Sequence, residues 1–167
     1  MARKNIILCG FMGCGKSTIG ALLAKKMGMA VIDLDTYIEK KENKTVAQIF
    51  EDSGEEHFRA LERQAVAELA EKRGVIIAAG GGTLTFSENV SVLKKNGQVI
   101  LLDVPVEVAA KRLEFDTARP LLKRPDKDEV IKELYEKRLP LYRAAADIIV
   151  DASDSPMQVC MAIMKEL

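Results

Sequence analysis

Short apolar runs alternate with helical patterns along most of the chain. Between these runs, apolar residues recur every three to four positions, as they do on one face of a helix. The runs are apolar at successive positions, which is typical of strands that are covered on both faces. They predict strands at residues 6–9, 30–32, 75–79, 98–102 and 148–150. The pattern therefore predicts an α/β fold: a five-stranded parallel sheet with helices on both faces and ligand sites at the carboxyl ends of its strands.

Several helix boundaries carry their own signals. Thr45 and Gln48 have the spacing of a capping box, and Gly54 is expected to end the short helix that begins there. A longer helix with an apolar face follows. Pro140 is expected to kink or end a later helix. Because the loops after the first three strands would leave the sheet at one edge, we expect their residues to form a single crevice.

The loop after the first predicted strand reads Gly-Phe-Met-Gly-Cys-Gly-Lys-Ser, residues 10–17, and fits the pattern GxxxxGK[ST]. In such a loop the backbone N–H groups surround a phosphate, Lys16 reaches the β and γ phosphates, and the Ser17 hydroxyl binds Mg²⁺. The strand before it and the helix after it disfavour a chance glycine-rich turn. ATP and Mg²⁺ are therefore the predicted ligands. The predicted nucleotide-binding residues of this segment are Gly13, Cys14, Gly15, Lys16, Ser17 and Thr18.

Two carboxylates follow the second predicted strand. Asp33 and Asp35 are two positions apart, so one could contact Mg²⁺ while the other accepts a proton from a substrate hydroxyl. This division of labour is what kinase chemistry requires. The alternative is that Asp35 only caps a helix beginning at Thr36.

Gly80, Gly81 and Gly82 follow the third predicted strand, where their backbone could approach a ligand without side-chain obstruction. A plain flexible turn is the alternative. Arg59 lies on the long helix with Glu62 one turn later, where the carboxylate can hold the guanidinium group.

Two further arginines lie in the second half of the chain. Arg119 falls in residues 113–126, a segment with two prolines that is expected to be a lid closing over phosphates. Arg138 is on the helix that follows. Any one of the three arginines, taken alone, is more readily explained as an ordinary surface residue, and it is their combination that indicates a site.

The composition of the chain limits the kinds of partner that it is expected to bind. Lys plus Arg and Asp plus Glu number 25 each in 167 residues, so a nucleic-acid partner is not expected. The three cysteines lack metal-binding spacing, and no apolar run reaches membrane-spanning length. We expect one domain over residues 1–167, a cytoplasmic monomer without a membrane or nucleic-acid partner.

The motifs together resemble shikimate kinase over nearly the whole chain. They are residues 10–17, Asp-Leu-Asp at 33–35, Phe-Arg at 58–59 with Glu62, the three glycines, Arg-Pro-Leu-Leu at 119–122, Arg-Leu-Pro-Leu-Tyr at 138–142 and Ala-Asp at 146–147. The resemblance implies a P-loop kinase similar to nucleoside monophosphate kinases, with a substrate-binding helical region near residues 34–62. It implies ATP-dependent phosphorylation of the shikimate 3-hydroxyl, giving shikimate 3-phosphate and ADP, in chorismate and aromatic amino acid biosynthesis.

The same resemblance implies residue roles. Asp35, Lys16 and Arg119 would be catalytic, and Ser17 with Asp33 would hold the metal. Arg112 would stack on the adenine. The shikimate-binding set would be Asp35, Arg59, Gly80, Gly81, Gly82 and Arg138.

Two positions depart from the family pattern. Ala79 stands where a hydroxyl residue is common, which puts a water-mediated metal contact there in doubt, and Cys14 replaces a small residue. Because Cys14 lies near Lys16 and a helix N-terminus, its thiolate should be favoured, and thiol reagents should inhibit unless ATP protects.

Two other functions stay open. One is a kinase for another small molecule or a nucleoside monophosphate. The other is a nucleotide-dependent switch or ATPase that acts on a protein partner.

Overall fold

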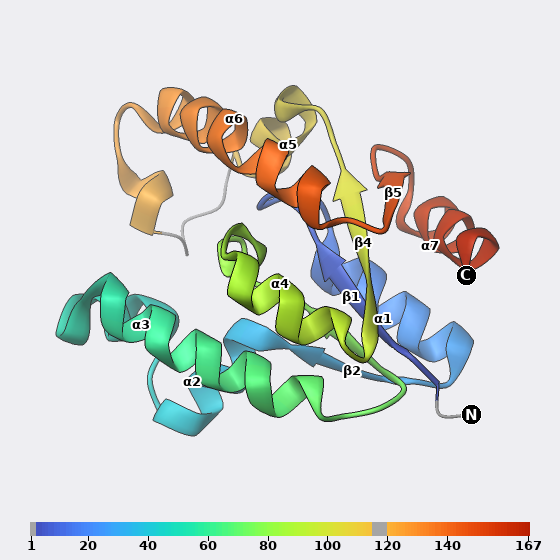
Figure 1. Ribbon diagram of the computed structural model, residues 1–167. Coiled ribbons are helices and arrows are strands. Elements are labelled where there is room, and N and C mark those ends of the chain that lie inside the picture. Colours follow the sequence, from blue (N-terminus) through green and yellow to red (C-terminus); the bar gives the residue numbers. More distant parts are fainter. Residues whose placement is uncertain (1–2, 115–119) are drawn as a thin grey trace.

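The computed structural model describes residues 3–114 and 120–167, and a parallel sheet forms its centre (Figure 1). The strands lie in the order β2-β3-β1-β4-β5, and every neighbouring pair is parallel. The five predicted strands are confirmed, with ends that shift by one residue at most. Their bounds are β1 (Asn5–Cys9), β2 (Ala30–Asp33), β3 (Val75–Ala78), β4 (Gly97–Asp103) and β5 (Ile148–Asp151).

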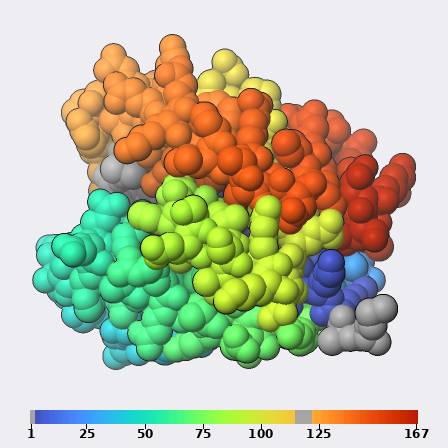
Figure 2. Space-filling view, in the orientation of Figure 1, coloured from blue at the N-terminus to red at the C-terminus, as the bar shows by residue number. Residues whose placement is uncertain are grey.

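Helices cover both faces of the sheet. On one face α1 and α7 contact each other, whereas α4 and α6 contact β4 from the opposite face and α3 packs beside α4 (Figure 1). In the space-filling view the side chains of α3, α4 and α6 close over that second face (Figure 2). The helices are α1 (Lys16–Met27), α2 (Leu34–Glu42), α3 (Val46–Ala70), α4 (Ser87–Lys94), α5 (Val106–Arg112), α6 (Lys127–Ala145) and α7 (Pro156–Glu166), with short 3-10 turns at Thr83–Thr85 and Pro120–Lys123.

The central strands form the core. Ile7 and Leu8 of β1 and Val99 and Ile100 of β4 are completely buried. Since both faces are covered, residues that point in opposite directions are equally apolar, which is why these strands read as continuous hydrophobic runs.

The predicted helix signals near the start of α3 are confirmed. Thr45 Oγ1 accepts a hydrogen bond from the Gln48 N–H at 3.1 Å, and Gln48 Oε1 accepts one from the Thr45 N–H at 2.9 Å. Gly54, with φ 82° and ψ 171°, breaks the helical conformation inside α3. The short first piece therefore ends where the sequence predicts, and the second piece leads to the predicted site residues.

Pro140 does not end its helix. α6 continues for five residues beyond it to Ala145. Pro140 and Glu136, whose carbonyl loses the usual helical partner, both belong to the exposed side of α6. Water can satisfy that carbonyl, which limits the disruption that proline causes.

The strand order places three loops side by side. β2, β3 and β1 are consecutive in the sheet, so the segments after their carboxyl ends meet, as predicted. In the described parts of the chain, no helix has both the length and the apolar character needed to cross a membrane. The predicted lid at 113–126 includes residues 115–119, so Arg119 lies outside the described residues, and the domain boundaries stay a prediction.

Candidate active site

Three predicted site side chains converge on the glycines at residues 80–82. A Cβ on the first glycine would lie 2.7 Å from Asp35 Oδ1, one on the second 3.0 Å from Arg138 Nη1, and one on the third 2.5 Å from Arg59 Nη2. None of the three glycines has a positive φ. Close approach by these side chains, rather than an unusual backbone conformation, is therefore the reason for glycine here. This packing argues against a plain flexible turn.

A buried hydrogen-bond chain holds Arg59. Its Nη1 donates to Glu62 Oε1 at 2.9 Å, and Glu62 Oε2 accepts from Thr83 Oγ1 at 2.8 Å. The Thr83 carbonyl in turn accepts from Asn89 Nδ2 at 3.0 Å. The Glu62 side chain is only 1% exposed, so its charge is compensated chiefly by the Arg59 guanidinium. Thr83 and Asn89 were missed in the sequence, where only their closeness to the glycines could have indicated them.

Part of the Arg59 guanidinium group is not engaged within the described chain. Nη2 lies 3.5 Å from a carboxylate oxygen of the exposed Glu55, and the buried Nε has no hydrogen-bond partner among the described residues. A buried donor without an acceptor costs about 1–3 kcal/mol. The Arg59 side chain is 14% exposed, so an incoming carboxylate could reach part of the guanidinium group, and such a group can offer two parallel hydrogen bonds to one carboxylate.

Arg138 is placed by α6. Tyr142, one turn later in that helix, donates from its hydroxyl to the Gly81 carbonyl and so ties α6 to the glycine segment. Burial raises the pKa of Tyr142 to about 12, so the hydroxyl keeps its proton for this hydrogen bond.

Asp33 and Asp35 have different structural environments. Asp33 is the N-cap of α2, and its Oδ1 accepts from the Thr36 N–H at 3.0 Å. The alternative that Asp35 caps this helix is therefore wrong, since Asp35 lies inside the first turn. Burial, with repulsion from Asp33 and Glu62 opposed by attraction to Lys16, raises the pKa of Asp35 to about 6. Asp35 is thus a stronger base than an ordinary aspartate.

This pKa predicts a pH-dependent stability difference in the metal-free protein. Between about pH 4 and 6 the folded state binds the Asp35 proton more tightly than the unfolded state does, so stability falls as pH rises through this window. Asp35→Asn should therefore raise the free energy of unfolding at neutral pH by about 3 kcal/mol. Below about pH 4 the difference should vanish. Urea titrations of both proteins across this range measure it, and a variant that is less stable at neutral pH would contradict it.

The metal site predicted at Ser17 and Asp33 has suitable donors. Ser17 Oγ donates to Asp33 Oδ2 at 3.5 Å, so a hydroxyl and a carboxylate oxygen are neighbours at the start of α1. Within the described ranges no group of three His, Cys, Asp or Glu side chains could hold a metal. A cation bound at Ser17 and Asp33 would complete its shell with water and phosphate oxygens, which is the preference of Mg²⁺.

Lys16 lies against its own loop. Its Nζ donates to the Gly10 carbonyl at 2.5 Å and to the Phe11 carbonyl at 3.4 Å. Phosphate oxygens would compete with these carbonyls for the ammonium group, and a charged acceptor makes the stronger hydrogen bond.

The structure adds a constraint on the expected reactivity of Cys14. Its side chain is completely buried, and its Sγ lies 3.7 Å from Lys16 Nζ and fills the space beside Gly10. The reaction of Cys14 with thiol reagents stays a prediction, and burial of the sulfur means that it would require the loop to open. Any contact of residue 14 with phosphate would come from its backbone.

Burial of the three cysteine side chains predicts slow modification of their thiols in the folded protein. Cys9, Cys14 and Cys160 are all buried, so a disulfide reagent should modify the folded protein slowly and the urea-unfolded protein at once. The release of the chromogenic thiol reports both rates. A fast phase of one equivalent that disappears in Cys14→Ser would show that the loop opens readily.

Arg112 borders a cavity beside the phosphate-binding loop. Its Nη1 donates to the Gly13 carbonyl and its Nη2 to the Ala152 carbonyl, both at 3.1 Å. The cavity has a volume of about 250 Å³. Its lining is Cys14, Gly15, Thr18, Ile19, Arg112, Ala152, Asp154 and Pro156. The segment between β5 and α7 was missed in the sequence, although its place after the carboxyl end of a strand was the available signal.

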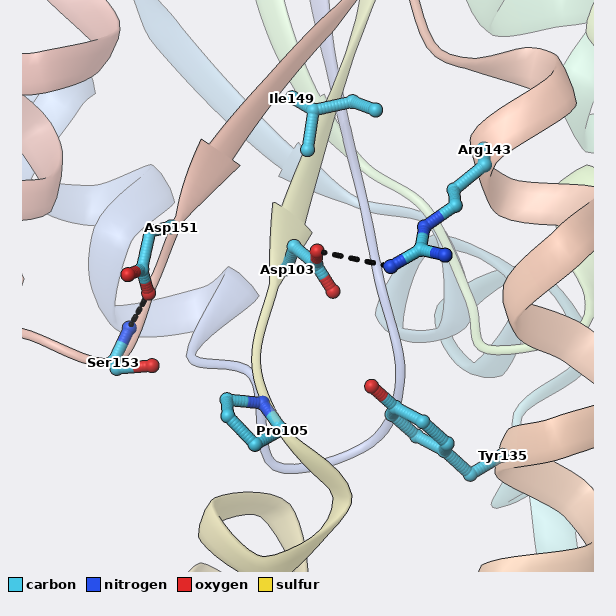
Figure 3. A pocket seen from close by; sticks show the side chains of 7 residues that line it. All are labelled: Asp103, Pro105, Tyr135, Arg143, Ile149, Asp151 and Ser153. Atoms are coloured by element: carbon cyan, nitrogen blue, oxygen red, sulfur yellow. Dashed lines mark hydrogen bonds and ion pairs between the residues drawn. The ribbon is translucent and has the colours of Figure 1, made fainter.

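A second cavity, of about 370 Å³, lies beside the edge strand β5 (Figure 3). Its side chains include Asp103, paired with Arg143 at 3.6 Å, and Asp151, which accepts from the Ser153 N–H at 2.9 Å. None of its lining residues is a predicted site residue. The cavity near Arg112 is therefore the better candidate for a nucleoside.

The class follows from these features. A parallel sheet of order 2-3-1-4-5 carries a phosphate-binding loop after its first strand, and a hydroxyl with a carboxylate stands at the start of the next helix. The protein is a P-loop kinase.

Comparison with known proteins specifies the family. The family model described as shikimate kinase matches residues 12–167. The shikimate kinase of Persephonella marina is 43% identical over 161 residues, which cover 96% of this chain and 97% of the relative. That of Sulfurihydrogenibium sp. is 42% identical over 164 residues and 98% of both chains. The chain belongs to the shikimate kinase family, as the resemblance implied.

Solved structures of shikimate kinases have the same fold as this chain. Shikimate kinase from Acinetobacter baumannii in complex with shikimate has a TM-score of 0.89 and 35% identity, covering 98% of this chain and 94% of its own. The Aquifex aeolicus enzyme has a TM-score of 0.85 and 39% identity, covering 96% and 94%. The predicted fold class is confirmed. Membership of the shikimate kinase family also confirms the predicted phosphotransferase activity and disfavours the alternative of a switch or an ATPase that acts on a protein partner.

Proposed function

We propose that this chain transfers the γ-phosphoryl group of ATP to the 3-hydroxyl of shikimate, giving shikimate 3-phosphate and ADP. The observation that carries the assignment of residues is the convergence of Asp35, Arg59 and Arg138 on the glycines at 80–82. Two cationic groups and one basic carboxylate suit a small ring that bears a carboxylate and several hydroxyls.

The arginines would bind and orient the acceptor. A guanidinium group holds a carboxylate through two parallel hydrogen bonds, which fixes direction as well as distance. Arg59 is already held by Glu62, so little side-chain freedom remains to be lost on binding. With Arg138 as a second contact, the ring would present one hydroxyl to Asp35.

Asp35 would accept the proton of that hydroxyl. In a loose transition state the oxygen needs little prior deprotonation, so the base acts late, as the bond to phosphorus forms. A pKa of about 6 leaves Asp35 mostly ionised at neutral pH and makes it a better proton acceptor than an ordinary aspartate.

The nucleotide would occupy the loop at residues 13–18, with Arg112 beside the adenine. When bound at Ser17 and Asp33, Mg²⁺ neutralises charge on the β and γ phosphate oxygens. Lys16 would stabilise charge on the transferring group. The lid at 113–126 would bring Arg119 to the phosphates and exclude water. A cytoplasmic location and a monomeric state are predictions of the same proposal.

An assay of ADP release tests the proposal. ADP formation from Mg·ATP is compared with shikimate, gluconate and nucleoside monophosphates as acceptors, and phosphorus NMR locates the new ester. We expect ADP release only with shikimate and a single 3-phosphate product. A rate that ignores shikimate, or an ester at another hydroxyl, would overturn the proposal.

A further inference from the structure

Phe86, at the start of α4, departs from two usual preferences of amino-acid residues: those for the N-cap position and for burial. It is the N-cap residue of this helix, a position that favours Ser, Thr, Asp or Asn, and its side chain makes no capping hydrogen bond. The residue is also 41% exposed, although its side chain is large and apolar. Sites at which a residue contradicts its local environment are often sites of function.

The Phe86 ring lies over the Arg59 guanidinium group. The distance from Arg59 Cζ to the centre of this ring is 5.3 Å, and the Phe58 ring lies at 5.4 Å from the same atom. Both distances are within the range of cation–π attraction. Phe58 is buried and belongs to the core, whereas Phe86 reaches the guanidinium group from the loop before α4.

Together these neighbours restrict the guanidinium group. Glu62 holds Nη1, the backbone of Gly82 lies against the group where a Cβ would be 2.5 Å from Nη2, and two aromatic rings lie near Cζ. An aromatic wall also shields a charged hydrogen bond from water, which strengthens that bond.

We propose that Phe86 is a positioning residue for shikimate. Its ring holds the Arg59 guanidinium group in the orientation that receives the substrate carboxylate. The inference rests on the proposed role of Arg59. In it, Phe86 affects shikimate binding only by orienting Arg59.

Phe86→Ser separates this role from a structural one. Serine is a favoured N-cap residue, so the melting temperature should stay the same or rise. Loss of one cation–π contact should raise the KM for shikimate by about two- to fivefold. The KM for ATP and kcat should not change. Phe86→Tyr keeps the ring and should restore the wild-type KM for shikimate. A lower melting temperature, or equal changes in both KM values, would overturn the inference.

A double-mutant cycle distinguishes action through Arg59 from direct contact with the substrate. In an Arg59→Lys background, Phe86→Ser should change the KM for shikimate less than it does in the wild type, because the oriented fork is already lost. An undiminished effect would mean that Phe86 contacts the ring itself and would overturn the inference. If Arg59→Lys alone leaves the KM for shikimate unchanged, the proposed role of Arg59 fails instead.

Discussion

Asp35→Asn should lower kcat by about 10² to 10⁴ while ATP binding persists. The amide keeps the shape of the carboxylate but cannot accept the proton of the reacting hydroxyl. Steady-state kinetics with shikimate and Mg·ATP measure kcat, and titration with a fluorescent ATP analogue measures nucleotide binding. A melting curve of Asp35→Asn at neutral pH checks that the variant is folded, so that a slow rate can be assigned to the lost proton acceptor.

Asp52→Asn is a matched control for this substitution. Asp52 is an exposed carboxylate of the first piece of α3, and it pairs with the exposed Lys44 at 2.9 Å. Its replacement should leave kcat unchanged, because exposed ion pairs contribute little. Near-normal turnover of Asp35→Asn would remove Asp35 from the mechanism.

Arg59→Lys should raise the KM for shikimate by about 10- to 100-fold, with a much smaller change in the KM for ATP. Lysine keeps the positive charge beside the buried Glu62, so the fold retains its charge balance. Lysine cannot offer two parallel donors to a carboxylate. It also lacks the planar guanidinium group that packs against the two aromatic rings. Initial rates at varied shikimate and saturating ATP give the KM.

Arg63→Lys provides the comparison on the same helix. Arg63 lies one turn beyond Arg59 and is exposed, so the identical chemical change should have no effect on either KM. If Arg59→Lys behaves like Arg63→Lys, Arg59 belongs to the surface and not to the acceptor site.

Much of the fold could be predicted because its signals are local. Buried strands, the capping box at Thr45 and the break at Gly54 depend on a few neighbouring residues. The shared crevice could also be predicted, since parallel strands end at one edge of the sheet. The pairing of Arg59 with Glu62 follows from helical spacing alone.

The remaining features depend on contacts between distant segments. Which aspartate caps α2 is decided by where β2 ends, and the burial of Cys14 by its packing beside Gly10. The continuation of α6 past Pro140 depends on which side of that helix faces water. The Phe86 ring reaches Arg59 only after α3 and α4 pack together, and no spacing in the sequence encodes that approach.

The chain from Asn89 through Thr83 and Glu62 to Arg59 has a mechanical consequence. It joins the second piece of α3, the turn after the glycines and the start of α4 through groups that would be left unpaired if these segments separated. We therefore expect these three segments to keep their relative positions when a ligand binds. A displacement of α2 or of the first piece of α3, which precede the bend at Gly54, would leave all of these hydrogen bonds intact.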